Sequence, residues 1–303
     1  MTAHFASRTV TLPPLLFALG EASQMLKQED PWVTTNVKQE TFLRTCVEGL
    51  IPSDLISLLP EIESMASWNA GEINAWLRAR GFSIELSPFD ADTFGIAAVF
   101  KLLLEWFEVG TSDLVIAPDG QTYPGFKLET DTFVQIGRSS LAPHPIVLIS
   151  AKNGDQVFLT KTVPGFLRED EDFVLVDRAR EILGALDLDE KPPFTSVIIP
   201  KVDLNQSVDI GWLQGMNAMT QMRGVTERAT LIEAKQQTKL RMNEHGAKVE
   251  SAAAMGVCLE CYSPEENLVI NEPFLMVVTR TGIRLPLFVG IIGEEDWKDP
   301  GKL

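Results

Sequence analysis

From about residue 113 onward, a series of short apolar segments rich in Val, Ile, Leu and Phe predicts β-strands. The segments are SDLVIA (112–117), PIVLIS (145–150), QVFLT (156–160), FVLV (173–176), SVIIPKVDL (196–204), FLMVVTR (274–280) and LPLFVGII (285–292). The last two are separated by a turn through Thr281-Gly282, which predicts a hairpin. A chain with so many strands must pair them in extensive, largely antiparallel sheets.

Helical patterns dominate the first part of the chain and recur between the strands. The predicted helices are 12–26, 41–65 with a break near Pro52, 70–82, 178–186 and 209–219. In the 70–82 segment, Ile73, Trp76 and Leu77 share one face. The segment FGIAAVFKLLLEWFEV (94–109) fits a helix by its length and a central strand by its continuous apolarity. The sequence therefore predicts an α+β fold, and no linker divides the 303 residues, so we expect a single domain over 1–303.

Charge and composition exclude several classes of function. The formal net charge of −16, without a local basic cluster, argues against a nucleic-acid partner. No apolar run reaches membrane-spanning length, so we expect no membrane partner. The N-terminal segment 1–20 contains two prolines and little positive charge, which fits a signal peptide poorly. The chain has only three cysteines, which favours a reducing, cytoplasmic location, although secretion stays an alternative.

Signs of catalysis are sparse, and we expect neither enzymatic activity nor a cofactor. The sequence has no phosphate-binding glycine loop and no dinucleotide fingerprint. Cys258 and Cys261 have the CxxC spacing of zinc and redox sites. A zinc site needs a second pair of ligands, and a thioredoxin-like site needs the motif at the start of a helix after a strand. Neither context is present, so no metal site is predicted.

The segment EHGAKVESAAAMG (244–256) alternates in the manner of a strand, yet it is built from weak strand formers. Ala247, Val249, Ser251 and Ala253 are small and mostly apolar, and charged or alanine residues stand between them. Alanine disfavours strands, and a glycine stands at each end of the run. Two simple structures fit this segment: a permanent edge strand and an alanine-rich turn of helix.

The C-terminal part resembles the serpin superfamily in the order and spacing of several motifs. The matching pieces are IPK (199–201), DI (209–210), GM (215–216), MNEHG (242–246), SAAA (251–254), EPFL (272–275) and PLFVG (286–290). Upstream, EINAWLRARGFSIEL (72–86) and DTFGIAAVFKLLLEW (92–106) are similar to a serpin helix-to-strand step and a serpin central strand.

The resemblance implies a serpin-like single domain with a reduced N-terminal helical region. Its parts would be a shortened helical part (1–69), helix and central sheet (70–243), hinge and reactive-centre loop (244–271) and C-terminal strands (272–303). Gln236 stands where serpins usually carry a histidine, and TLPPLLFALG (11–20) lacks the usual serines. These departures favour the alternative of a non-inhibitory, serpin-fold binding protein.

The same resemblance implies that the chain inhibits a protease as a suicide substrate. A target protease of the serine or cysteine class cleaves the exposed loop, and the freed loop then inserts into the central sheet. The implied hinge is Glu244, Gly246 and Ala247, and the implied inserting residues are Val249, Ser251 and Ala253.

Counted from the hinge as in inhibitory serpins, the resemblance implies a reactive bond near Glu260-Cys261. Glu260 would suit an acid-preferring protease, and Tyr262, if the bond lies two residues further on, a chymotrypsin-like one. The alternative reading of CLECYSPEEN (258–267) is an ordinary exposed loop.

Overall fold

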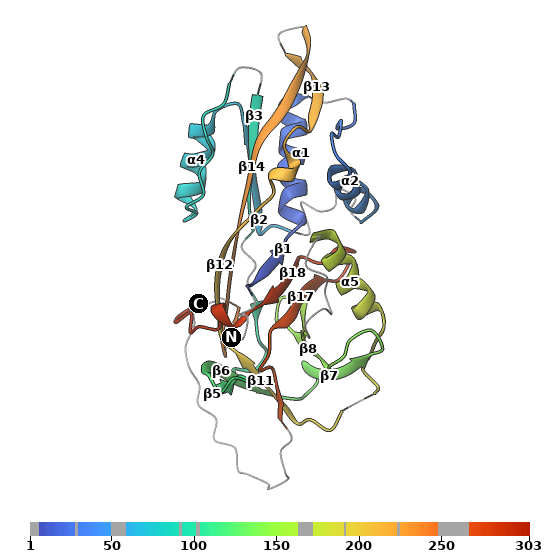
Figure 1. Cartoon of the computed structure of the whole chain (residues 1–303), viewed down its shortest axis with the longest axis vertical. Coiled ribbons are helices and arrows are strands. Elements are labelled where there is room, and N and C mark those ends of the chain that lie inside the picture. The colour runs from blue at the N-terminus through green and yellow to red at the C-terminus, as the bar shows by residue number, and fades with distance from the viewer. Residues whose placement is uncertain are drawn as a thin grey trace.

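The protein is an α+β molecule in which three sheets are surrounded by a small number of helices (Figure 1). The computed structural model describes residues 6–27, 30–49, 59–90, 93–100, 104–162, 172–190, 192–222, 225–247 and 267–303. No helix in this described part is long and apolar enough to cross a membrane.

The first sheet has seven strands and contributes much of the hydrophobic core. In order, its strands are β1 (Arg8–Val10), β18 (Phe288–Ile292), β17 (Phe274–Arg280), β9 (Asp155–Lys161), β8 (Ile146–Ser150), β7 (Val134–Ser139) and β10 (Leu186–Asp187). All of these neighbours pair in the antiparallel direction. The predicted hairpin between β17 and β18 is confirmed, and Gly282 in its turn has a φ of 88° that glycine adopts without strain.

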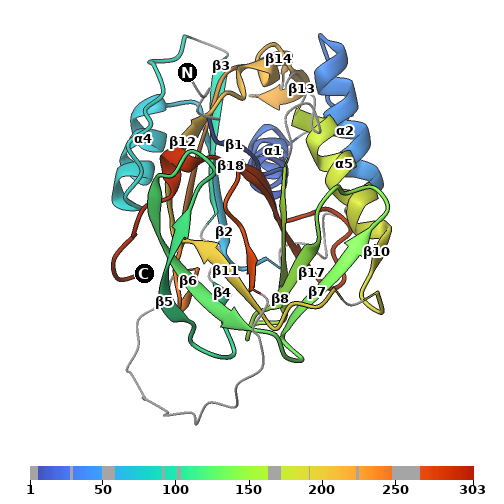
Figure 2. The same cartoon turned by 60° about the horizontal axis from the view of Figure 1, so that its bottom comes forward.

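The second sheet has four strands and lies at the lower end of the molecule in Figure 1, which is turned forward in Figure 2. Its order is β16 (Asn267–Val269), β11 (Ser196–Pro200), β6 (Thr122–Glu129) and β5 (Thr111–Ile116).

The third sheet runs along the length of the molecule and contains the functional region. Its order is β12 (Val202–Val208), β14 (Val225–Met242), β3 (Thr93–Phe100) and β2 (Ile62–Ser67), with β13 (Asn217–Met222) beside the first half of β14. A further two-residue pair joins β4 (Leu104–Glu105) to β15 (Gly246–Ala247). Because β14 has 18 residues, it pairs with β13 and β3 in its first half and with β12 in its second half.

Two helices cover opposite faces of the third sheet. Helix α1 (Pro13–Leu26) starts with prolines at its first positions, where their missing N–H groups cost nothing, and packs on β2 and β3. Helix α4 (Ala70–Ala79) is capped by the Asn69 side chain, which accepts a hydrogen bond from Gly71 N at 2.8 Å. Its buried Ile73 and Leu77 join Ala97 and Val99 of β3 in a separate small core.

Two more helices lie together on one side of the molecule in both views (Figure 1, Figure 2). Helix α2 (Val37–Gly49) and helix α5 (Asp172–Gly184) meet through Phe42 and Phe173, whose ring centroids are 6.2 Å apart. The short 3-10 segments η1 (Gly211–Leu213) and η2 (Glu294–Asp296) complete the described helices.

Three predictions of secondary structure were wrong. FVLV (173–176) lies in α5, where Phe173, Val176 and Ala179 form a buried helical stripe that overrides the strand preference of the segment. The last residues of the predicted helix 41–65 form strand β2 instead, in which Met65 pairs with Ala97 of β3. The predicted helix 209–219 is reduced to η1 and then enters β13. Of the segment 94–109, which fitted both a helix and a strand, residues 94–100 belong to β3 and residues 104–105 to β4.

Candidate functional site

The candidate site is the tight turn that follows β14, here called the hinge turn (residues 243–246). Asn243 and Gly246 form an antiparallel bridge, and the Gly246 N–H donates to the Asn243 carbonyl at 3.2 Å. The His245 N–H donates to Asn243 Oδ1 at 2.9 Å, which closes the turn from inside. The predicted hinge residues Glu244 and Gly246 therefore lie in a well-defined turn, and Ala247 continues from it in β15.

Trp106 holds the hinge turn from the side of β4. Its indole Nε1–H donates to the Asn243 carbonyl at 3.0 Å, and its backbone N–H donates to the His245 carbonyl at 3.3 Å. Trp106 is only 2% exposed, so both bonds are shielded from water. Gly246 and Ala247 pair with Glu105 and Leu104, so the chain that leaves the turn already lies beside β4.

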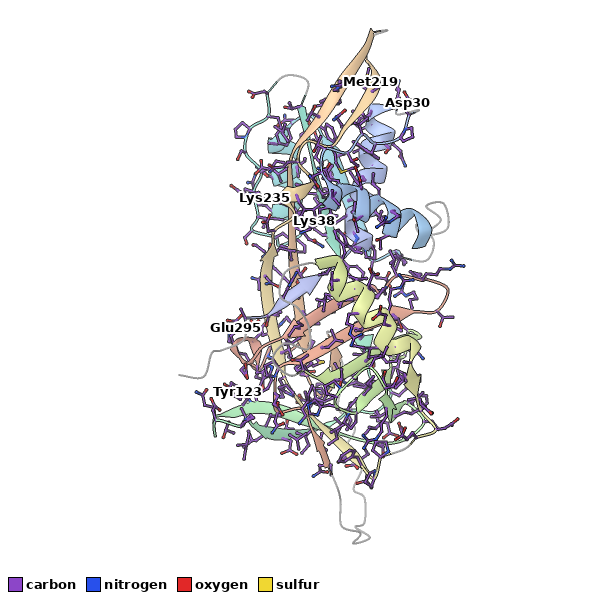
Figure 3. The ribbon with its side chains drawn as sticks, turned by 45° about the vertical axis from the view of Figure 1, so that its right-hand side comes forward. Asp30, Lys38, Tyr123, Met219, Lys235 and Glu295 are labelled. Carbon is purple, nitrogen blue, oxygen red and sulfur yellow. The ribbon has the colours of Figure 1, made fainter. Side chains whose placement is uncertain are left out.

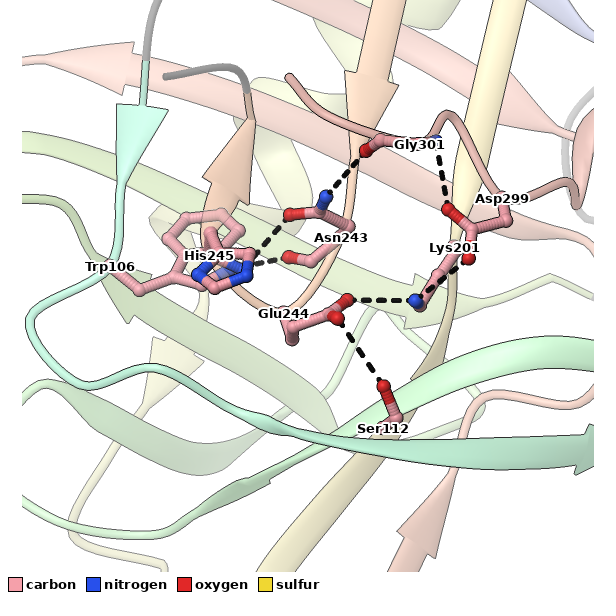
Figure 4. A network of polar contacts seen from close by, with 8 residues as sticks. All are labelled: Trp106, Ser112, Lys201, Asn243, Glu244, His245, Asp299 and Gly301. Atoms are coloured by element: carbon pink, nitrogen blue, oxygen red, sulfur yellow. Dashed lines mark hydrogen bonds and ion pairs between the residues drawn. The ribbon is translucent and has the colours of Figure 1, made fainter. Parts of the chain in front are cut away.

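Lys201 holds the hinge turn from the other side through two carboxylates (Figure 4). Its Nζ lies 2.9 Å from Glu244 Oε2 and 3.0 Å from Asp299 Oδ2, and its side chain is 8% exposed. Ser112 donates its hydroxyl to Glu244 Oε1 at 3.3 Å. The turn is therefore tied to β11–β12, to β5 and to the C-terminal segment.

The charges in this cluster stabilise one another. Burial alone raises the pKa of Glu244, but the hydrogen bond and charge of Lys201 outweigh it and leave that pKa below its ordinary value. The Gly301 N–H and then the Lys201 ammonium lower the pKa of Asp299. Burial lowers the pKa of Lys201, but its two carboxylate partners leave it raised.

A gap in the third sheet starts at the hinge turn, and we call it the slot. Strands β3 and β14 run parallel and pair from Thr93↔Thr230 to Ala97↔Lys235. Beyond that point, no pairing joins the two strands within the described residues. A cavity of about 560 Å³ occupies the gap. Its two edges are Ala98, Phe100 and Leu104 on one side and residues 236–241 of β14 on the other. The remaining lining residues are Thr11, Pro14, Val278 and Phe288 of the core, and Arg80, Gly81 and Phe82.

The floor of the slot contains a buried polar contact at Gln236, where the resemblance suggested a histidine. Gln236 Nε2 donates to the Thr11 carbonyl at 3.0 Å and to Thr11 Oγ1 at 2.8 Å. Thr11 Oγ1 also lies 3.2 Å from Thr238 Oγ1. Gln236 is 4% exposed, and through Nε2 it ties β14 to the segment before α1 without a titratable group.

The other predicted site residues lie outside the described part of the chain. These are the inserting residues Val249, Ser251 and Ala253 and the reactive bond Glu260-Cys261. Sequence reasoning missed Asp299 and the site roles of Asn243, Trp106 and Lys201. The last three stood inside matched motifs, and Asp299-Pro300-Gly301 has the composition of a turn, but nothing in these stretches indicated that they meet at the hinge.

Comparison with known proteins finds serpins both in the sequence and in the fold. A family model described as serpin (serine protease inhibitor) matches residues 177–294, which include the slot-forming half of β14 and the hinge turn. The solved structure of a serpin from Schistosoma mansoni superposes with a TM-score of 0.65 over 95% of each chain, at 13% identity. The resemblance to serpins is thereby confirmed: residues 177–294 match the serpin family model, and the chain as a whole has the fold of serpins.

The chain is also similar to further members of the serpin family. Mouse alpha-2-antiplasmin is 31% identical over 126 residues, which cover 39% of this chain and 25% of that protein. The chain thus matches about a quarter of the length of this curated relative. The thermophilic serpin tengpin in its native state has a TM-score of 0.57 at 11% identity, covering 96% of this chain and 89% of tengpin. Thyroxine-binding globulin in complex with thyroxine has a TM-score of 0.56 at 13% identity, covering 97% and 93%.

Proposed function

We propose that this serpin inhibits a protease of the serine or cysteine class as a suicide substrate. The protease nucleophile attacks the carbonyl of Glu260, the peptide bond to Cys261 breaks, and the Cys261 amine leaves with a proton. Glu260 stays bound to the enzyme as an ester or thioester. The freed loop then enters the slot and traps the enzyme before water hydrolyses that bond.

The observation that carries the proposal is the register of the hinge turn on both sides of the slot. Along β14, the Asn243↔Gly246 bridge sets an antiparallel register in which Ala254 would reach Lys235. Along β4 and β3, the pairs Gly246↔Glu105 and Ala247↔Leu104 set a register in which Ala254 would reach Ala97. Ala97 and Lys235 are the last residues that pair β3 with β14 before the slot. Residues 247–253 therefore match the length of the slot on both edges.

The same register puts suitable side chains on each face of the new strand. Val249 would lie opposite Leu240, Ser251 opposite Thr238, and Ala253 opposite Gln236. Thr238 and Gln236 contact Thr11 on the core side, so these small residues would enter the cavity above Val278 and Phe288. Small side chains fill such a space without overpacking.

The charged residues of the segment would face away from the core. Glu250 would lie opposite Lys239, which is exposed and donates to the Gly81 carbonyl at 2.7 Å. Opposite charges directly across two strands stabilise their pairing. About a dozen new ladder hydrogen bonds, at about 1 kcal/mol each, make insertion favourable by roughly 10 kcal/mol.

The test is incubation with a panel of serine and cysteine proteases, read as covalent complex and cleaved protein on a denaturing gel. We expect the wild type to form complex with at least one protease. Val249→Arg forces a charge onto the core face of the new strand, so cleavage should persist while complex is largely replaced by cleaved product. Lys248→Arg, one residue away on the other face, is the matched control and should behave like the wild type. Equal complex yields from Val249→Arg and the wild type would contradict the proposal.

A non-inhibitory binding role is the second candidate, and it is supported by Gln236 in place of the usual histidine. One structural neighbour, thyroxine-binding globulin, is described in complex with a small molecule. This role predicts clean cleavage of the loop by every protease in the panel, with no complex at any ratio of protein to protease.

A further inference from the structure

The last residues of the chain pack against the hinge turn. Residues 297–303, here called the C-terminal clamp, are anchored at both ends. Trp297 is 2% exposed and makes an edge-on contact with Tyr123, with ring centroids 5.1 Å apart. Leu303 is 6% exposed. Figure 3 shows Glu295 and Tyr123 in the lower half of the molecule, below Lys235, with Met219 near the top.

Between these anchors, the clamp makes polar contacts with Lys201, which supports the hinge turn, and with Asn243 of the turn itself (Figure 4). Asp299 Oδ2 lies 3.0 Å from Lys201 Nζ, so Asp299 and Glu244 share one ammonium group. The Gly301 carbonyl accepts a hydrogen bond from Asn243 Nδ2 at 3.1 Å. The Gly301 N–H donates to Asp299 Oδ1 at 2.8 Å, which fixes the clamp's own turn.

These contacts hold residues of the hinge turn that need not move when the loop inserts. They involve the side chain of Asn243 and the partner of Glu244, and they leave residues from Gly246 onward free to extend along the slot. The Asn243↔Gly246 bridge belongs to the ladder that a growing strand would continue. The clamp can therefore support the first paired residues without opposing the addition of more.

We propose that residues 297–303 clamp the hinge turn and keep Gly246 and Ala247 seated at the mouth of the slot, so that a cleaved loop starts insertion from an existing nucleus. Forming the first pairs of a strand orders several residues for few bonds, so a preformed nucleus speeds the steps that follow. The effect of the clamp on trapping rests on the proposed inhibitory function, whereas the contacts of the clamp with the hinge turn do not.

The experiment compares the full chain with a variant that lacks residues 299–303 and with the milder Asp299→Asn. Asparagine keeps an acceptor for the Gly301 N–H and loses only the charge that faces Lys201. Lys302→Ala changes an exposed residue inside the clamp and is the matched control. Two quantities are measured for each protein: amide hydrogen exchange at Trp106 and Gly246, and the ratio of protease complex to cleaved protein.

Deletion should speed exchange at both amides about 3- to 10-fold and lower the complex ratio by a similar factor, because one hydrogen bond and one shared ion pair are lost. Asp299→Asn should give a smaller change in the same direction, and Lys302→Ala should match the wild type. Unchanged exchange after deletion would overturn the clamp and leave the inhibitory function standing. Faster exchange with an unchanged complex ratio would overturn the role of the clamp in trapping, and so would faster exchange when the wild type forms no complex. Either result would support only the hold of the clamp on the hinge turn.

Discussion

Replacing Gly246 with alanine should unseat the hinge from the slot. Gly246 has a φ of 143°, a conformation that residues with a side chain adopt only at a cost of about 1–3 kcal/mol. An added Cβ would lie 2.2 Å from the Leu104 carbonyl oxygen and 2.9 Å from Glu105 Cα. Both are backbone atoms of β4, so they cannot rotate away as a flexible side chain would. Together the strain and the overlap cost at least about 2 kcal/mol, which corresponds to a shift of about 30-fold toward the unseated hinge.

The assay is hydrogen exchange at the Trp106 amide, which donates to the His245 carbonyl in the seated hinge. Gly246→Ala should speed this exchange by at least tenfold, and it should lower the yield of protease complex. Gly120→Ala is the matched control, because Gly120 also has a positive φ, 86°, but no atom lies within 4 Å of the added Cβ. If Gly246→Ala exchanges at the Trp106 amide no faster than Gly120→Ala, the description of the seated hinge is wrong.

Substitutions of two further residues, Lys201 and Arg280, test the ion pairs. Glu244 and Asp299 have lowered pKa values, so they contribute stability above their unfolded pKa values and lose it as the pH falls through the folded ones. Lys201→Met should lower the free energy of unfolding by about 2 kcal/mol at pH 7 and flatten its decline from about pH 5 to pH 3, measured by urea titration at each pH. Arg280→Met leaves Asp155, which is 0% exposed, without its guanidinium partner, so it should cost about 3 kcal/mol by the same titration. Arg280→Lys should recover only part of that loss, because an ammonium cannot replace the fork that binds both Asp155 and Glu61; full recovery would refute this reasoning.

Local patterns predicted those elements whose burial follows a simple period. Helix α1 was predicted to end at Leu26 and ends there. In α4, the predicted buried face contains Ile73 and Leu77, both 0% exposed. The predictions failed where the partner element, rather than the segment itself, decides the conformation. FVLV became helical because α5 packs on β1 and β18, and Met65 became part of a strand because β3 offers an edge for pairing.

The hinge residues were implied by the serpin resemblance, whereas nothing in the sequence indicated what holds them. The structure places Gly246 and Ala247 in β15. Lys201, Glu244 and Asp299 come from separate parts of the chain, and an isolated charged residue in a sequence carries no sign of its partner. Only the fold brings both carboxylates within 3.0 Å of Lys201 Nζ.

The central claim is that cleavage lets the loop enter the slot, and the thermal midpoint of the cleaved protein tests it most directly. A single nick within 255–263 should raise the midpoint by more than about 10 °C, because residues 247–253 then complete the sheet between β3 and β14. The same nick in Val249→Arg should produce a much smaller rise. A midpoint that stays the same or falls after a clean nick of the wild type would contradict the claim.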